Sequence, residues 1–269
     1  MPTTFEDLDR EIKRRELAAV LARLGRKYLI VSGKGGVGKT TAAVNLAWLL
    51  AGQGKRVGLL DIDLHGPDLA AALYCDSPIT ADGQGRLVPV EAAPGLYVLT
   101  IQHLLTDPRQ AVMWRGPRKI RAIGQFLGET AWPELDYFLI DSPPGTGDEA
   151  LTVINHIKDL TALVITTGHP LSISDVYKAV SCLKQSKTKI LGLVENQSAL
   201  ICPECSRLIE LYPPENVLTL AGETGLEVLA RLPWDPAAAR RAEEVRRPLA
   251  AACPDSPAAL ILKELAQKL

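Results

Sequence analysis

The stretch Ile30–Thr41 restricts the fold of this chain more than any other. From Gly33 to Thr40 it has the pattern Gly-x-x-x-x-Gly-Lys-Thr, which is typical of a loop that binds the phosphates of a nucleotide. The apolar run Tyr28–Val31 before it predicts a buried strand, and Thr41–Leu50 after it predicts a helix. The alternative is a glycine-rich turn that carries a lysine by chance, but the order of strand, loop and helix favours a phosphate site.

The residues of this loop have separate expected roles. Its glycines allow backbone N–H groups at the start of a helix to approach phosphate oxygens. Lys39 is expected to reach the β- and γ-phosphates, and the hydroxyl of Thr40 to bind Mg²⁺, a hard cation that prefers oxygen ligands. The residues expected to contact the nucleotide are Gly33, Lys34, Gly35, Gly36, Val37, Gly38, Lys39, Thr40 and Thr41.

Three acidic residues come at the ends of predicted apolar strands. Asp61 and Asp63 lie two residues apart and therefore point to the same side. Beside a magnesium nucleotide, Asp61 is expected to hold the metal through water and Asp63 to orient or activate the attacking water. Either carboxylate could instead cap a short helix near Pro67. Asp141 is expected to accept hydrogen bonds from water on Mg²⁺ or from Thr40.

Apolar strands alternate with helical segments along most of the chain. This order predicts the α/β class, a single-domain P-loop NTPase with a mostly parallel sheet covered by helices on both faces. Ligands of such sheets bind at the carboxyl ends of the strands. One such strand, Ile190–Val194, is followed by Asn196, which we expect to read the edge of an adenine. The chain has no Asn-Lys-x-Asp guanine signature, so ATP is the expected nucleotide.

The pattern also divides the chain. Residues 1–26 have apolar side chains at helical spacing and predict an N-terminal helical segment that packs on the ATPase domain, residues 27–269. Within that domain we expect a loop with two cysteines near 197–215 and a hairpin insertion near 76–101. The two expected strands of the insertion are Leu87–Val90 and Leu96–Leu99.

The composition of the chain indicates which classes of partner and which cellular location to expect. At 269 residues, of which 47% are hydrophobic, the chain can bury a large core. Its formal net charge of −1 argues against a basic face that binds nucleic acid. No apolar run approaches the length of about 18 residues typical of a membrane span, and no signal-peptide core precedes Lys27. We therefore expect a cytoplasmic protein with neither a nucleic-acid nor a membrane partner.

A second candidate site is the spacing Cys-x-x-Cys formed by Cys202 and Cys205. Both sulfurs can face one metal, but zinc or an iron–sulfur cluster usually takes four protein ligands. A two-fold dimer would bring two such pairs together and complete a four-thiolate site. A structural zinc or vestigial site, and a redox dithiol, are the alternatives.

The loop carries a second lysine, Lys34, directly after its first glycine. The sequence Gly-Lys-Gly-Gly-Val-Gly-Lys-Thr-Thr resembles the deviant Walker A loop of the superfamily of MinD, ParA and the nitrogenase iron protein. The resemblance implies a dimer in which Lys34 reaches the nucleotide of the other copy, as an arginine finger does. Considered by itself, Lys34 could be a solvated loop lysine.

Further motifs resemble those of the Mrp/ApbC family of iron–sulfur cluster carrier ATPases, over roughly Lys27–Pro236. The resemblance implies a homodimer that holds a [4Fe–4S] cluster between two cysteine pairs and delivers the cluster to apo-proteins. From the cysteine spacing alone, zinc is a possible substitute for the cluster. The motifs are Trp114–Pro117, Asp136–Asp148, Gly192–Ser198, Cys202–Cys205 and Leu232–Pro236.

The last of these motifs implies that Pro233 and Asp235 lie near the nucleotide base. The chain departs from the family pattern at Gln197, where Met is usual, and at Ser206, where Gly is usual. A positioning switch like MinD or ParA, which uses ATP to bind membrane or DNA, is the alternative function. A nucleotide-gated reductase is a third.

Overall fold

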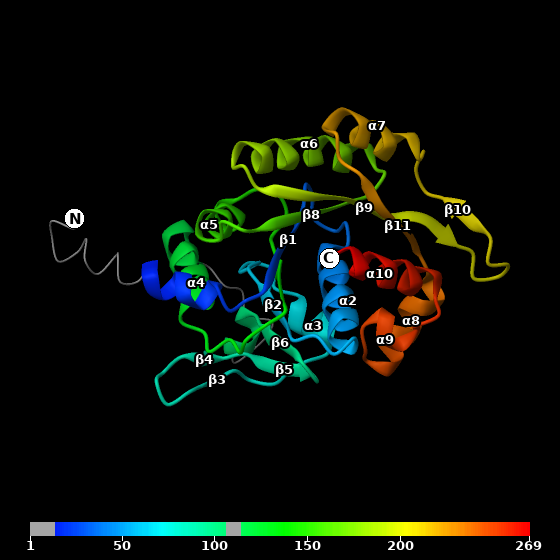
Figure 1. The fold of residues 1–269 in the computed structure, drawn as a ribbon. Coiled ribbons are helices and arrows are strands. Elements are labelled where there is room, and N and C mark those ends of the chain that lie inside the picture. The colour runs from blue at the N-terminus through cyan, green and yellow to red at the C-terminus, as the bar shows by residue number, and fades with distance from the viewer. Residues whose placement is uncertain (1–13, 106–113) are drawn as a thin grey trace.

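A largely parallel sheet forms the centre of the molecule (Figure 1). The computed structural model describes residues 14–105 and 114–269. The strands of this sheet are β1 (Arg26–Ser32), β2 (Val57–Asp61), β5 (Val90–Ala93), β6 (Leu96–Leu99), β7 (Tyr137–Asp141), β8 (Thr161–Thr166), β9 (Lys189–Ile201), β10 (Leu208–Glu210) and β11 (Val228–Trp234). Along the path of strand pairings the order is β10-β9-β8-β1-β7-β2-β6-β5. Strand β11 also pairs with β9, along the side opposite to β8 and β10.

The four central strands β8, β1, β7 and β2 are parallel and lie in the core. Their residues are almost all buried because helices cover both faces, which explains why the strands are continuous apolar runs. The register aligns Asp61 of β2 with Asp141 of β7, and Asp141 with Ile30 of β1. The three carboxyl ends therefore open at the same edge of the sheet.

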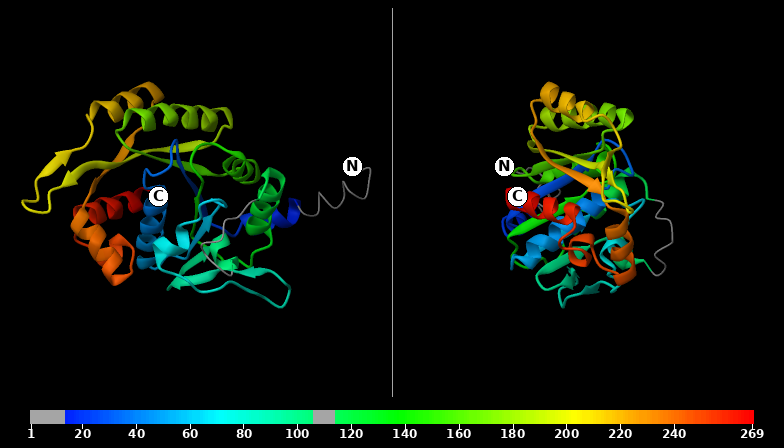
Figure 2. Two further views of the ribbon diagram at one scale, coloured as in Figure 1. Left: turned by 180° about the vertical axis from the view of Figure 1, so that it is seen from behind. Right: turned by 90° about the vertical axis from the view of Figure 1, so that its right-hand side faces the viewer.

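Helices pack on both faces of the sheet (Figures 1 and 2). The core cluster on one face includes side chains of α2, α3 and α10, and the cluster on the other face includes those of α4 to α7. This arrangement confirms the predicted fold class. The helices are α2 (Lys39–Gly52), α3 (Leu69–Leu73), α4 (Gly116–Gly128), α5 (Asp148–His156), α6 (Pro170–Gln185), α7 (Glu215–Thr224), α8 (Pro236–Val245), α9 (Leu249–Ala252) and α10 (Pro257–Lys268).

The segment 76–101 differs from the expected strand pair Leu87–Val90 with Leu96–Leu99. A small hairpin joins β3 (Thr80–Ala81) to β4 (Leu87–Val88), and β5 pairs with β6 in the main sheet. Pro89 separates β4 from β5 because proline has no N–H to donate to a ladder. Strand β6 also pairs in parallel with β2, so only the small hairpin lies outside the main sheet.

Residues 14–21 are helical, and Leu21 and Leu24 are buried in the core of the domain. Phe5, Leu8 and Ile12, which begin the apolar pattern predicted for residues 1–26, lie outside the described residues. The division at residue 26 therefore stays a prediction. Within the described ranges, no helix has both the length and the apolar character needed to cross a membrane.

The expected cysteine loop near 197–215 is largely a β-hairpin. Strand β9 continues past the nucleotide-binding edge to Ile201, and the chain then turns back into β10. The two strands are antiparallel: Ala199 pairs with Glu210, and Ile201 pairs with Leu208. Cys202 and Cys205 lie in the turn, which projects beyond the sheet at the right of Figure 1. We call Ala199–Glu210 the cysteine hairpin.

Candidate functional site

The phosphate-binding loop joins β1 to α2 at the carboxyl edge of the sheet. Gly36 and Gly38 have φ angles of 78° and 85°, which favour glycine over residues with a Cβ atom. Gly33 lies so close to α6 that a Cβ atom would stand 2.5 Å from the backbone of Asp175. These close approaches explain why the loop needs glycine at more positions than phosphate contact alone requires.

Inside the loop, Lys39 and Thr40 both point to Asp141. The Nζ atom of Lys39 donates to Oδ1 of Asp141 at 3.0 Å, and Oγ1 of Thr40 donates to Oδ2 at 2.6 Å. The contact between Thr40 and Asp141 is one that the sequence predicted. Burial raises the pKa of Asp141, and the ammonium of Lys39 opposes that shift. The carboxylate of Asp141 therefore joins the loop to the end of strand β7.

Asp61 is fully buried beside this group. It accepts hydrogen bonds from Oγ1 of Thr100 at 2.9 Å and from the backbone N–H of Asp63 at 2.8 Å. Burial, and then the neighbouring charge of Asp141, hold the pKa of Asp61 well above its usual range. Carboxylate and hydroxyl oxygens are the donors that Mg²⁺ prefers, so Thr40, Asp61 and Asp141 fit that ion chemically.

Asp63 does not cap α3, whose N-cap position is Asp68, but it holds the turn before that helix. Its Oδ1 accepts from the backbone N–H groups of His65 at 3.2 Å and Gly66 at 3.0 Å. These bonds stabilise the turn that precedes α3. Activation of water by Asp63 stays a prediction.

Lys34 is exposed on the loop surface. Its carbonyl oxygen accepts from Oγ of Ser32 at 3.0 Å. Its charge contributes to the lowered pKa of Asp175, although the hydrogen bond from Lys178 is the larger cause. An exposed lysine at this place is compatible both with a solvated side chain and with one that reaches a second copy.

Asn196, near the middle of β9, contacts the loop directly. Its Nδ2 donates to the carbonyl oxygen of Val37 at 2.8 Å. A Cβ atom on Gly38 would lie 2.1 Å from the same Nδ2. Asn196 therefore supports the loop, and its contact with an adenine stays a prediction.

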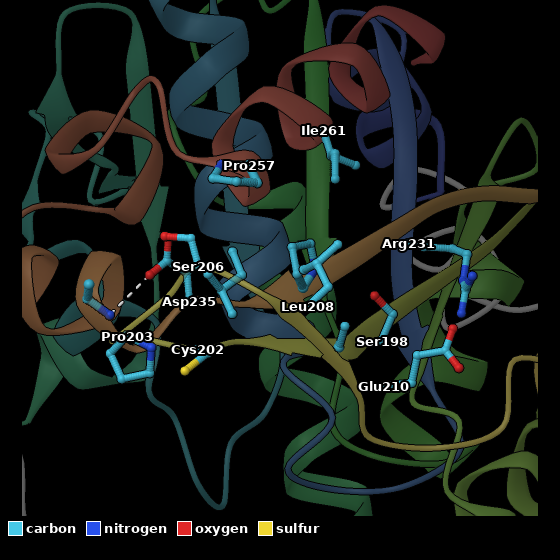
Figure 3. A pocket seen from close by; sticks show the side chains of 14 residues that line it. Ser198, Cys202, Pro203, Ser206, Leu208, Glu210, Arg231, Asp235, Pro257 and Ile261 are labelled. Carbon is cyan, nitrogen blue, oxygen red and sulfur yellow. Dashed lines mark hydrogen bonds between the residues drawn. The ribbon is translucent and has the colours of Figure 1, made fainter.

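Asp235 lies next to the cysteine hairpin (Figure 3), and Pro233 lines the same cavity as residues of that hairpin. Oδ1 of Asp235 caps α8 by accepting from the N–H groups of Ala237 at 3.0 Å and Ala238 at 2.9 Å. Both Pro233 and Asp235 line a cavity that also includes Cys202. The structure does not test their expected contact with a nucleotide base.

The turn of the cysteine hairpin is held by backbone bonds. The N–H of Cys202 donates to the carbonyl of Arg207 at 2.9 Å, and that of Ser206 to the carbonyl of Cys202 at 2.8 Å. Ser206 has a φ of 59°, in the left-handed region that glycine enters more easily, so the serine adds strain there. Gln197, the other departure from the family pattern, has a φ of 54°.

The two thiols of this turn differ in exposure, since Cys205 is exposed and Cys202 is partly buried like Cys75, Cys182 and Cys253. The backbone N–H groups of Cys205 and Glu204 lower the pKa of Cys202 because they stabilise its thiolate. Within residues 14–105 and 114–269, no three side chains of His, Cys, Asp or Glu are grouped to hold a metal ion. The pair therefore supplies two metal ligands of the usual four.

A cavity of about 600 Å³ lies between the cysteine hairpin and helices α8 and α10 (Figure 3). Leu208 and Glu210 of β10 line it together with Cys202, and Ile261 of α10 lies on the opposite wall. Arg231 of β11 lines the same cavity. The cavity is thus directly connected to one of the two thiols.

The sequence argument missed two polar pairs. Thr100 supports Asp61, and it directly follows a strand that the sequence placed in an insertion. Arg231 donates through Nε to Oε2 of buried Glu195 at 2.6 Å, whereas Oε1 of Glu195 has no partner among the described residues. For the pair of Arg231 and Glu195, the sequence offered one signal: Glu195 directly precedes Asn196 at the end of a predicted strand.

The chain is similar to known proteins along most of its length. A family model described as ParA, NUBPL iron-transfer P-loop NTPase, matches residues 23–269. An iron-sulfur cluster carrier protein of Methanocaldococcus jannaschii is 40% identical over 216 residues, which cover 80% of this chain and 74% of that protein. The cytosolic Fe-S cluster assembly factor NUBP2 of Bos taurus is 37% identical over 254 residues, 93% of each chain.

Solved structures show the same fold. A nucleotide-binding protein from Archaeoglobus fulgidus in complex with ADP has a TM-score of 0.70 and 32% identity, and the match covers 95% of this chain and 92% of that one. The cell division ATPase MinD of Pyrococcus furiosus has a TM-score of 0.64 and 28% identity, and the match covers 91% and 98% of the two chains.

Proposed function

This chain belongs to the NUBPL iron-transfer P-loop NTPase family, and we propose that it is an ATPase that carries a [4Fe–4S] cluster between two copies of itself and transfers it to apo-proteins. The observation that carries the proposal is the pair Cys202 and Cys205 in an exposed turn, where one chain provides only two thiolates. Two copies related by a two-fold axis would provide four, the usual number for such a cluster.

The phosphate-binding loop would bind ATP with the β- and γ-phosphates near Lys39. In the described structure Lys39 pairs with Asp141, so binding exchanges one anionic partner for another within a buried site. Thr40, Asp141 and, through water, Asp61 would hold Mg²⁺, which neutralises charge on the phosphates. Asp63 would orient the attacking water, and Lys34 would contribute its charge to the nucleotide of the second copy.

Strand β9 gives a physical connection between the two sites. Asn196 holds the carbonyl of Val37 in the loop, and Cys202 follows directly after the end of the same strand. A change in the loop that moves Asn196 would therefore act on the base of the cysteine hairpin. This connection supports a carrier whose hold on its cluster depends on the nucleotide.

The partners and location follow from the same proposal. Recipients are apo-proteins that need an iron–sulfur cluster, and the second subunit is another copy of this chain. Relatives named cytosolic assembly factors, such as the NUBP2 protein of Bos taurus, support a cytoplasmic location.

Anaerobic reconstitution with iron and sulfide tests the proposal. Wild-type protein should bind about four iron and four sulfide per dimer, by the four-thiolate argument. The double variant Cys202→Ser, Cys205→Ser should lose the cluster, whereas Cys253→Ser should retain it as a matched control on a thiol outside the hairpin. Full iron and sulfide content in the double variant would refute the proposal.

The same preparations separate the carrier from the alternatives. Zinc without sulfide in protein purified from cells would indicate a structural metal site. ATP-dependent co-sedimentation with liposomes or DNA would indicate a positioning switch, and we expect none.

A further inference from the structure

Strand β10, which begins two residues after Ser206, has one edge that no described strand covers. It is the last strand in the order and pairs only with β9 among the described strands. All three of its residues are exposed. The open edge therefore lies next to the proposed cluster site.

The register shows which backbone groups this edge presents. The N–H of Cys202 donates to the carbonyl of Arg207, so these two residues form a hydrogen-bonded pair of the antiparallel ladder. Hydrogen-bonded pairs alternate along such a ladder, and Ile209 opposite Leu200 is the next one. The N–H and C=O groups of Leu208 and Glu210 therefore point away from β9, to the open edge.

Natural proteins usually protect such an edge. Lysine, proline or a charged side chain on the edge strand prevents unwanted pairing. Here Leu208 is 60% exposed and Ile209 is 46% exposed, and the prolines Pro213 and Pro214 come only after the strand has ended. Glu210 gives the strand one charged side chain, but neither lysine nor proline stands among its three residues, so its outward N–H and C=O groups stay open to another strand.

A second copy of the chain cannot occupy this edge and share the cluster at once. Two identical edge strands related by a two-fold axis pair antiparallel, so their turns point in opposite directions. In a pairing centred on Ile209, Ser206 of each copy lies three residues from the two-fold axis. A strand rises about 3.3 Å per residue, so the two turns would stand roughly 20 Å apart. Four thiolates that bind one cluster must all lie within bonding distance of it.

We infer that the edge of β10 docks an extended segment of the recipient apo-protein, which adds one strand to the sheet beside the cluster. The inference rests on the proposed carrier function and names how the recipient is recognised. In strand addition, backbone hydrogen bonds provide affinity and pockets for alternate side chains provide specificity. Leu208 and Glu210 supply the backbone groups.

The cavity beside Cys202 supplies the pocket. Leu208 and Glu210 line it, so the face of β10 that carries their side chains looks toward the cavity (Figure 3). An added strand would place alternate side chains on the same face. The apolar part of the wall, which includes Ile261 and Pro257, favours an apolar side chain at that position of the recipient.

Cluster transfer from reconstituted protein to a purified apo-form of a [4Fe–4S] hydro-lyase tests the inference. Leu208→Pro removes one N–H that points outward and leaves the ladder bonds of Ile209 in place. We expect the acceptor concentration at half-maximal rate to rise roughly fivefold, the effect of one backbone hydrogen bond. Leu208→Ala keeps the N–H and should change it less.

Leu218→Ala is the matched control because Leu218 of α7 is 58% exposed but lies on a helix. Iron content per dimer and ATP turnover should be unchanged in all three variants. If wild-type protein holds no cluster, the carrier function has failed. If it holds a cluster and Leu208→Pro transfers at the wild-type rate, only the docking inference has failed.

Hydrogen exchange on the wild-type protein gives a readout that requires no variant. The amides of Leu208 and Glu210 should exchange more slowly when the apo-acceptor is added, while the amide of Ile209 should change little because it already bonds to β9. Protection that depends on protein concentration without acceptor would show that a second copy occupies the edge, and would overturn the inference.

Discussion

The phosphate-binding loop and the cysteine hairpin lie along one strand, β9, but differ in how their geometry is fixed. The loop is packed against α6 and held by Asp141 and Asn196, so its working side chains have partners within the chain. The hairpin is exposed, and its turn is held mainly by two backbone bonds. The difference indicates that the nucleotide site is preorganised by the fold, whereas the thiol site has only two ligands in one chain and, under the proposed function, is completed by a second copy.

The phosphate-binding loop and the cysteine hairpin also differ in the direction of their pKa shifts. Asp61 and Asp141 are both buried, and burial raises the pKa of each. The charge of Asp141 raises the pKa of Asp61 further. Two buried carboxylates with one lysine carry an electrostatic cost that a divalent cation relieves. At the hairpin the shift has the opposite sign, because N–H groups stabilise the thiolate of Cys202. The loop is therefore poised for a cation, and the hairpin for a metal that binds thiolate.

The substitution Lys39→Met should have the largest effect. It removes the ammonium that neutralises Asp141 and is expected to reach the phosphates, so ATP turnover should fall at least about 100-fold. The substitution leaves the bond from Asn196 to Val37 in place, so alkylation rates of Cys202 and Cys205 in nucleotide-free protein should not change. Phosphate release and thiol alkylation, measured on the same preparation, check both statements.

Lys27→Met is the control because Lys27 is also buried and paired, with Asp159, at the opposite edge of the sheet. It should lower the melting temperature and leave the ATP turnover of folded protein unchanged. A large change in thiol reactivity in Lys39→Met alone would show that the hairpin is not independent of the loop.

The same difference between the loop and the hairpin explains which of their features could be predicted from the sequence. The loop, Asp141 and its bond to Thr40 were predictable because the phosphate-binding pattern and the apolar strands are local signals. The hairpin was not, because β10 is only three residues long and its pairing with Ala199–Ile201 depends on residues that are distant in sequence. Thr100 was missed for a similar reason, since β6 joins β2 through a parallel pairing that no local pattern shows.

A pair of glycine substitutions tests how tightly the loop is packed. Gly36 and Gly38 both have positive φ, but a Cβ atom on Gly36 meets nothing within 4 Å, whereas one on Gly38 meets Nδ2 of Asn196. Gly36→Ala should cost about 1 kcal/mol of unfolding free energy from backbone strain. Gly38→Ala should cost about 2 to 3 kcal/mol because Asn196 must also give up its bond to Val37.

Urea unfolding without nucleotide measures both costs. In the background Asn196→Ala the clash is absent, so Gly38→Ala should cost only the strain, and the double-mutant cycle should show the difference as coupling. Equal costs for the two glycines in the wild-type background would mean that Asn196 does not hold the loop.

The smallest effect is expected at the hairpin, in the pH dependence of thiol alkylation. The thiolate is the reactive form, and the pKa of Cys202 lies below the usual 9.0, whereas burial raises the pKa of Cys75. Below pH 9 Cys202 should therefore react several-fold faster with iodoacetamide than Cys75, and the ratio should narrow as the pH rises. Peptide mass spectrometry of the reduced apo-protein gives both rates.

Unfolding in urea is the control for this last comparison, because the two thiols should then titrate alike. Coincident curves in the folded protein would show that the turn does not stabilise the thiolate of Cys202. A separation between them would mean that one exposed hairpin already favours the form of cysteine that binds metal before any metal or second copy arrives. In that case the hairpin has the electrostatic preparation that is also found at the loop, and it lacks only the further ligands that, under the proposed function, a second copy would bring.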